Sequence, residues 1–208
     1  MVVGQVGVAR MDEPLPGGCI LAGGRSRRFG SDKARALLEG EPLIKRLAEQ
    51  LRPVTASVTV VADRAERYAD LGLKTVADRE PGQGPMGGLL RALEEPGPAW
   101  KLVVSCDLLE LRRHWVTRLL EARQAGVGAV AFVEGGQGGR WQPFPGLYHR
   151  DLAARLRDSL REGRRAMQRM LEEVGAVAVA LPSDWPVTVQ ANSPAELARF
   201  AKRRRRGV

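Results

Sequence analysis

Short apolar runs alternate along the chain with longer segments whose apolar residues recur at helical spacing. The clearest helix covers residues 43–51, where Leu43, Leu47 and Leu51 share one face between Pro42 and Pro53. Further helices are predicted at 64–70, 86–95, 113–124, 152–160, 167–174 and from residue 193 onward. Strands are predicted at 18–22, 58–61, 73–77, 100–105, 127–133, 144–148, 176–181 and 187–190.

This alternation of strands and helices predicts an α/β fold with three layers, in which a mostly parallel sheet carries helices on both faces. Residues 1–16 are expected to form a flexible N-terminal arm, 17–201 a single domain, and 202–208 a basic C-terminal tail. Ligands of such sheets bind beyond the carboxyl ends of the strands. The loops that follow residues 22, 77 and 105 are therefore the expected binding region.

Composition narrows the choice of partners. The chain has 208 residues, of which 44% are hydrophobic, and a net charge of +9 that favours a polyanionic partner such as nucleic acid, an acidic membrane or a phosphorylated small molecule. Aromatic residues make up only 5%, which argues against base-stacking platforms. No apolar run is long enough to span a bilayer and no signal peptide is recognisable, so a cytoplasmic protein is expected.

Cysteine and histidine chemistry is not favoured. Cys19 and Cys106 lie in separate apolar runs without further ligands nearby, which favours buried hydrophobic residues over a zinc site. His114 and His149 belong to no catalytic arrangement and are expected at the surface or at helix ends.

The first strand leads into a loop that is rich in glycine and basic residues. Gly23 and Gly24 would let the backbone approach a ligand, and four cations follow within nine residues: Arg25, Arg27, Arg28 and Lys33. The loop is either a phosphate-binding loop or an exposed basic loop. Its spacing fits neither a Walker loop nor the dinucleotide fingerprint.

Two carboxylates follow other predicted strands. Asp107 comes after the apolar run 102–106, and Asp78 follows the run 73–77. A carboxylate in this position suits Mg²⁺, which takes one or two carboxylates together with substrate phosphates. Either residue could instead be the N-cap of a following helix.

Several motifs, taken together and in order, resemble those of the molybdenum cofactor guanylyltransferases, also called molybdopterin-guanine dinucleotide synthases. They are LAGG-x-S-x-R-x-G-x-DK at 21–33, VAD at 76–78, GPMGG at 84–88, VSCD at 104–107, QPFPGLY at 142–148, EGRR at 162–165 and ANSPAEL at 191–197. The resemblance covers roughly residues 18–200. Two departures are Leu108-Leu109, where the family usually has Met-Pro, and Asp63, near which the family often has an Asn.

The resemblance implies a nucleotide-diphospho-sugar-transferase-like, Rossmann-like fold and the transfer of GMP from GTP to molybdopterin with Mg²⁺ as cofactor. It implies catalytic roles for Arg28, Lys33 and Asp107. The nucleotide would be bound by Leu21, Ala22, Gly23, Gly24, Lys33, Asp78, Gly87 and Asp107. The metal would be held by Asp107 and Asn192. Arg164 and Arg165 would bind the phosphate of the acceptor, unless they only form a solvated helix start.

The expected partners are GTP and molybdopterin, and molybdenum cofactor insertion and delivery proteins are possible further partners. Binding to a membrane or to nucleic acid is not expected. A monomer or weak homo-oligomer is expected. The nearest alternatives are molybdopterin cytidylyltransferases and phospholactate guanylyltransferases. The LAGG and GPMGG segments favour the guanine enzyme, because cytidylyltransferase relatives usually begin LAAG. An alternative of another class is a nucleic-acid-binding module that uses the basic run 202–206.

Overall fold

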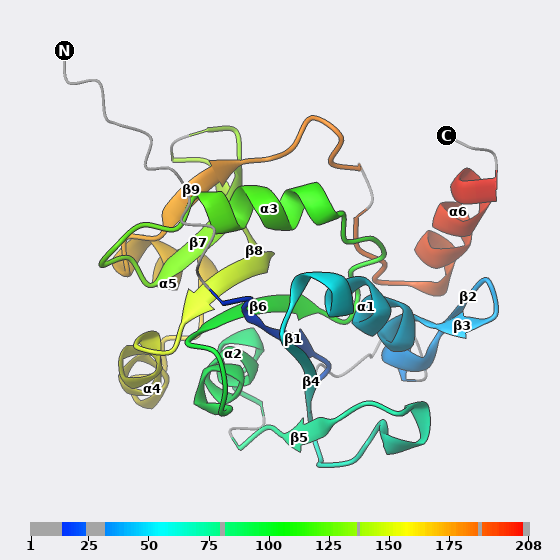
Figure 1. Ribbon diagram of the computed structural model, residues 1–208, viewed down its shortest axis with the longest axis horizontal. Coiled ribbons are helices and arrows are strands. Elements are labelled where there is room, and N and C mark those ends of the chain that lie inside the picture. The colour runs from blue at the N-terminus through cyan, green and yellow to red at the C-terminus, as the bar shows by residue number, and fades with distance from the viewer. Residues whose placement is uncertain (1–13, 24–31, 80–81, 137, 187–188, 206–208) are drawn as a thin grey trace.

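A seven-stranded sheet forms the centre of the protein. The computed structural model describes residues 14–23, 32–79, 82–136, 138–186 and 189–205. The sheet has the strand order β5-β4-β1-β6-β8-β7-β9 (Figure 1). The strands are β1 (Gly17–Leu21), β4 (Ser57–Ala62), β5 (Thr75–Ala77), β6 (Trp100–Ser105), β7 (Ala129–Glu134), β8 (Arg140–His149) and β9 (Val177–Ala180). Only β8 runs antiparallel to its neighbours, so the expected mostly parallel sheet is confirmed.

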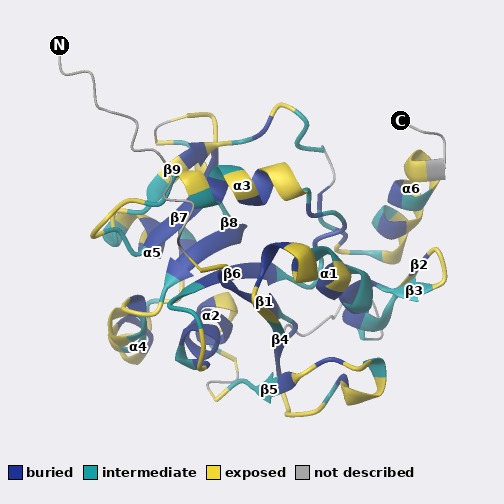
Figure 2. Ribbon diagram, in the orientation of Figure 1, coloured by how far each residue is buried: buried dark blue, intermediate teal, exposed yellow. Residues whose placement is uncertain are grey.

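Helices cover both faces of the sheet, which confirms the three-layer α/β fold. They are α1 (Leu43–Leu51) and α3 (Arg113–Glu121) on one face, and α2 (Pro85–Glu94), α4 (Leu152–Arg161) and α5 (Met167–Glu173) on the other. Alternate residues of a strand point to opposite faces. Ile20 of β1 therefore packs in the core with α1, and its neighbour Cys19 packs in the core with α2. Figure 2 shows the buried strands between the two helical layers.

The last helix, α6 (Pro194–Arg205), lies to the side of the sheet, near the two-stranded ribbon of β2 (Leu37–Leu38) and β3 (Glu41–Pro42) (Figure 1). Its apolar residues share a small separate core with the start of α1. Because α6 continues to Arg205, residues 202–205 of the expected basic tail belong to a helix. Residues 206–208 and 1–13 of the expected tail and arm lie outside the described part of the chain.

Most predicted elements occur within a few residues of their expected positions, with helix 43–51 and strand 100–105 matching at both ends. The helix predicted at 64–70 is wrong. That segment consists of turns followed by the short 3₁₀ helix η3 (Ala69–Leu71), because Glu66 has a left-handed φ of 59° that interrupts any helix. The predicted strand 144–148 is the second half of the longer β8.

Two further expectations concern the end of the chain and the membrane. The strand expected at 187–190 includes residues 187 and 188, which are not described, and its described end makes one isolated bridge between Gln190 and Leu108. Among the residues that the structure describes, no helix combines the length and apolar character needed to cross a membrane.

Candidate active site

The carboxyl ends of β1, β4, β5 and β6 meet at one edge of the sheet. Leu21 at the end of β1 is in register with Val61 of β4 and Ser105 of β6. Backbone hydrogen bonds continue beyond the strands, since Ala22 N–H donates to Val61 O at 2.8 Å and Cys106 N–H to Leu21 O at 3.0 Å. This register brings Ala22 and Gly23, which follow β1, and the Cys106-Asp107 turn, which follows β6, to the same edge of the sheet, where ligands were expected to bind.

Lys33 lies at this edge, beside Asp107, which follows β6. It begins the 3₁₀ helix η1 (Lys33–Arg35), and its side chain is only 10% exposed. Its ammonium group donates to Asp107 Oδ2 at 3.0 Å and to Asn192 Oδ1 at 3.1 Å. Three residues that the sequence singled out, separated by up to 159 positions, are thus joined through one cation.

Asp107 is held by more than Lys33. The Ser105 hydroxyl donates to Asp107 Oδ1, and Gln190 Nε2 donates in turn to Ser105 Oγ at 3.4 Å. Ala191 N–H donates to the backbone oxygen of Asp107 at 3.0 Å. The sequence reasoning missed Ser105 and Gln190, although Ser105 stands two residues before the carboxylate that it contacts.

Neither acidic candidate serves as a helix N-cap. The N-cap of α3 is Arg112, and the N-cap of α2 is Gly84. Asp78 instead follows β5, where its N–H donates to Ala62 O at 2.6 Å. A Cβ atom added to Gly23 would stand 3.8 Å from Asp78 Oδ2, so Gly23, the first glycine after β1, lies beside this carboxylate.

The start of α2 approaches β1 closely. Gly84 adopts a φ of +69°, a conformation that favours glycine, directly before Pro85 begins the helix. Gly87 and Gly88 are buried, and a Cβ atom on Gly88 would come within 3.4 Å of Leu21 Cδ2. The glycines of this motif therefore let the helix pack against the strand that enters the first loop.

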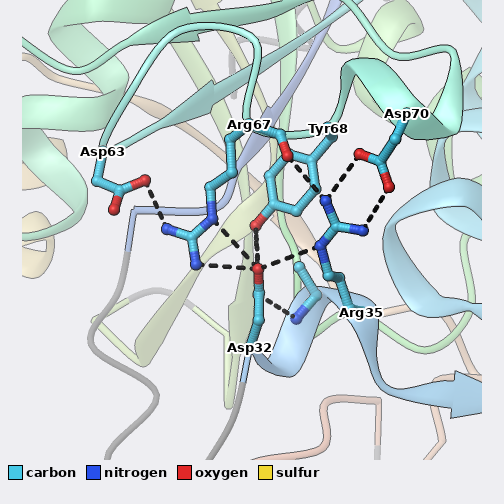
Figure 3. Close-up of polar contacts among 7 residues, drawn as sticks. Asp32, Arg35, Asp63, Arg67, Tyr68 and Asp70 are labelled. Atoms are coloured by element: carbon cyan, nitrogen blue, oxygen red, sulfur yellow. Dashed lines mark hydrogen bonds and ion pairs between the residues drawn. The ribbon is translucent and has the colours of Figure 1, made fainter.

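A cluster of charged residues connects the segment that carries Lys33 to the connection between β4 and β5 (Figure 3). Asp32, the N-cap of η1, accepts hydrogen bonds from Arg67 Nη2 at 2.9 Å and from the Tyr68 hydroxyl at 3.2 Å. Arg67 also pairs with Asp63 at 2.5 Å. Asp63, the departure from the family pattern, thus has a partner of its own. Sequence reasoning missed Asp32, Arg67 and Tyr68.

Tyr68 and the two cysteines keep their protons at neutral pH. Burial, together with the Asp32 charge, raises the pKa of Tyr68 well above its usual range, so its hydroxyl remains a donor. Burial and the adjacent Asp107 carboxylate raise the pKa of Cys106 to about 12, and burial raises that of Cys19 to about 12. Both thiols therefore keep their protons at neutral pH and are poor nucleophiles.

The remaining candidates lie elsewhere or outside the described residues. Arg28 and Gly24 fall within 24–31, which the structure does not describe. Arg164, between α4 and α5, contacts Glu162 and donates to Ser159 Oγ at 3.3 Å, whereas Arg165 is exposed. His114 lies at the surface as expected, with 57% of its side chain exposed, and pairs with Asp184; His149 pairs with Asp151, but only 25% of its side chain is exposed.

The donor set at this edge fits Mg²⁺ only together with a substrate. Asp107 and Asn192 present a carboxylate and an amide oxygen, the hard ligands that Mg²⁺ prefers. Within the described ranges, no group of three or more His, Cys, Asp or Glu side chains could hold a metal ion by itself. A magnesium ion bound here would therefore need phosphate oxygens to complete its shell.

Comparison with known proteins agrees with this geometry. The sequence profile of the MobA-like NTP transferase domain matches residues 18–178. The chain belongs to this family. A molybdenum cofactor guanylyltransferase from Pseudomonas aeruginosa is 33% identical over 182 residues, covering 86% of this chain and 91% of that protein. A "Probable molybdenum cofactor guanylyltransferase" from Opitutus terrae is 34% identical over 180 residues, covering 82% and 87%. The chain is thus a nucleotidyltransferase, and the resemblance inferred from its motifs is confirmed.

Solved structures show the same fold. Molybdopterin-guanine dinucleotide biosynthesis protein A from Archaeoglobus fulgidus superposes with a TM-score of 0.75 at 21% identity, covering 91% of this chain and 99% of that one. A CMP:2-keto-3-deoxy-manno-octonic acid synthetase in complex with CTP gives a TM-score of 0.72 at 15% identity, covering 93% and 100%. The nucleotide-diphospho-sugar-transferase-like fold is therefore confirmed.

Proposed function

We propose that this nucleotidyltransferase transfers GMP from GTP to the terminal phosphate of molybdopterin, forming molybdopterin guanine dinucleotide and pyrophosphate. The observation that carries the proposal is the position of the Lys33 ammonium group, within 3.0 Å of Asp107 and 3.1 Å of Asn192 at the carboxyl edge of the sheet. The names of the relatives from Pseudomonas aeruginosa and Opitutus terrae support GTP and molybdopterin as substrates.

The attacking group in this reaction needs no general base. A phosphate monoester is largely ionised near neutral pH, because its second pKa is ~6. This agrees with the protonated thiol of Cys106 beside Asp107, and with two histidines that pair with carboxylates outside the site. The difficulty is the approach of two anions, so the protein has to supply positioning and positive charge.

The chain's own residues divide these tasks. Lys33 neutralises charge on the departing pyrophosphate. Asp107 and Asn192 would hold Mg²⁺, which when bound neutralises further phosphate charge. The backbone of residues 21–24 would cradle the nucleotide phosphates, and Asp78 would accept hydrogen bonds from guanine or ribose. Gly87 would let the start of α2 approach the nucleotide, and Arg28, which lies outside the described residues, would add a second cation at the α-phosphorus.

Arg164 and Arg165 would bind the phosphate of the acceptor, molybdopterin. Arg165 is exposed and Arg164 is partly engaged by Glu162, so an incoming phosphate would compete with a weak surface pair. The same assignment includes cofactor insertion and delivery proteins as partners and a cytoplasmic location. A single domain over residues 17–201 and a monomer or weak homo-oligomer remain predictions of the sequence.

A direct assay separates the candidate reactions. Purified protein is incubated with molybdopterin, Mg²⁺ and radiolabelled GTP, CTP or ATP, and the labelled dinucleotide is identified by chromatography. Labelled guanine dinucleotide supports the proposal, whereas preferential use of CTP would assign the chain to the cytidylyltransferases. Asp107→Ala should abolish turnover. Asp158→Ala, which removes an exposed carboxylate on α4, is the matched control and should leave turnover unchanged.

A further inference from the structure

Asp32, the residue before Lys33, accepts hydrogen bonds from several donors. Its side chain is 21% exposed and accepts from Ala34 N–H at 3.1 Å, so it caps η1 directly. It also accepts from Arg67 through Nε at 3.2 Å and Nη2 at 2.9 Å, and from the Tyr68 hydroxyl at 3.2 Å. One carboxylate thus receives hydrogen bonds from its own turn and from a segment 35 residues away.

The partners of Asp32 are themselves fixed. Tyr68 is fully buried, with 0% of its surface exposed, in the core shared with α1. Arg67 is held from its other side by Asp63. Arg35, at the end of η1, donates to the backbone oxygen of Arg67 at 2.8 Å. Both ends of η1 are therefore attached to the connection between β4 and β5 (Figure 3).

Lys33 stands between these two attachments. Its neighbour on one side is Asp32, and Arg35 follows two residues later on the other. A lysine side chain is long and has many rotamers, so a well-placed ammonium group requires a fixed backbone beneath it. Two backbone bonds support the turn, from Arg35 N–H to Asp32 O and from Ala36 N–H to Lys33 O, both at 3.0 Å.

We propose that Asp32 and Arg67 are positioning residues, which hold η1 so that the Lys33 ammonium group stays at Asp107 and Asn192. The assignment of this role to catalysis rests on the proposed function, since it assumes that Lys33 contacts the nucleotide phosphates. The claim that Asp32 and Arg67 hold Lys33 in place does not rest on the proposed function, because the position of Lys33 can be measured without any nucleotide.

The first test measures that position by chemical labelling. An amine-acetylating reagent is applied briefly to the full-length, nucleotide-free protein, and the extent of modification is read by mass spectrometry. The Lys33 side chain is 10% exposed, against 45% for Lys45 and 63% for Lys74, which act as internal standards. In Asp32→Ala and Arg67→Met, labelling of Lys33 should rise toward that of Lys45. Unchanged protection of Lys33 in both variants would overturn the proposal.

The second test asks whether Asp32 acts through Lys33. Binding of a fluorescent GTP analogue is measured for wild type, Asp32→Ala, Lys33→Ala and the double variant. When Lys33 is present, Asp32→Ala should weaken GTP-analogue binding roughly tenfold, equivalent to ~1.4 kcal/mol. In the Lys33→Ala background, the same substitution should leave binding nearly unchanged. Equal losses in both backgrounds would show that Asp32 is merely structural and contradict the proposal.

Controls keep these outcomes separate from misfolding and from a wrong function. Asp158→Asn removes the charge of an exposed carboxylate on α4 that pairs with Arg161, and should leave Lys33 protection and GTP affinity within about twofold of wild type. Asp32→Asn keeps an acceptor for Ala34 N–H but loses the charge, so it provides a folded variant if Asp32→Ala unfolds. Failure of the wild type to bind GTP would refute the proposed function, and the labelling result would still decide whether Asp32 and Arg67 hold Lys33 in place.

Discussion

Replacing Lys33 with methionine removes a buried positive charge and keeps an apolar stem of similar length. The ammonium group makes two hydrogen bonds, to Asp107 at 3.0 Å and Asn192 at 3.1 Å, and the side chains of Lys33 and Asp107 are 10% and 21% exposed. A hydrogen bond to a charged group contributes ~1.5–3 kcal/mol. Because Asp107 keeps some solvent contact, we expect the lower end of this range for the loss in unfolding free energy.

For a chain of this length, a loss of ~1.5 kcal/mol corresponds to a fall in Tm of roughly 3–6 °C. The effect on activity should be larger. Removing one group that stabilises developing charge in a transition state lowers kcat by about 10²–10³, or ~2.7–4 kcal/mol. Lys33→Met should therefore be a folded protein that is severely impaired in GMP transfer.

The double variant Lys33→Met/Asp107→Asn separates the two effects. It removes the carboxylate that Lys33→Met leaves unpaired, so we expect Tm to return toward the wild-type value while activity stays lost. Thermal unfolding and steady-state kinetics with GTP and molybdopterin provide the measurements. The reasoning is refuted if Lys33→Met keeps nearly full kcat, or if its activity returns together with its Tm in the double variant.

Three further predictions concern the surroundings of the site. Ser105→Ala removes the hydroxyl that donates to Asp107 and should lower kcat with little change in Tm, as kinetics and unfolding together would reveal. Gly88→Val places methyl groups against Leu21, 3.4 Å from the added Cβ, and should destabilise by ~1–3 kcal/mol in denaturant titrations, whereas Gly88→Ala should be nearly neutral because better helix propensity offsets the contact. Burial raises the pKa of Asp184, but hydrogen bonds from Trp115, His114 and Arg112 lower it by more. The net effect is a pKa in the folded protein below the ordinary value of 3.8. Its contribution is present above that pH and lost below it; the Tm difference between wild type and Asp184→Asn should shrink on acidification, and a constant difference would contradict this.

Local patterns predicted the parts of the fold in which one segment decides its own structure. Helix 43–51 carries an apolar stripe between two prolines, and strand 100–105 is a mainly apolar run in which Lys101 is the one charged residue. The segment 64–70 has helical composition, yet Glu66 adopts a left-handed conformation while Arg67 and Tyr68 reach Asp32. Contacts from 35 residues away therefore outweigh the local preference, and no local pattern reports them.

The sequence also predicted the main residues of the site but not the residues that support them. Lys33, Asp107 and Asn192 stand in motifs that a resemblance can identify, and the structure brings all three together. Ser105 contacts Asp107 from only two residues away, but Gln190 reaches Ser105 through a contact that depends on how the chain after β9 returns to β6. That return path is a property of the topology, so spacing in the sequence could not reveal it.

The most direct test of the central claim follows the phosphorus atoms of GTP. The protein is incubated with Mg²⁺ and molybdopterin, using GTP labelled either at the α-phosphate or at the γ-phosphate. Attack at the α-phosphorus beside Lys33 and Asp107 predicts that the α-label enters the molybdopterin dinucleotide and the γ-label leaves as pyrophosphate. Release of the γ-label as inorganic phosphate, with no α-label in a molybdopterin product, would contradict the account.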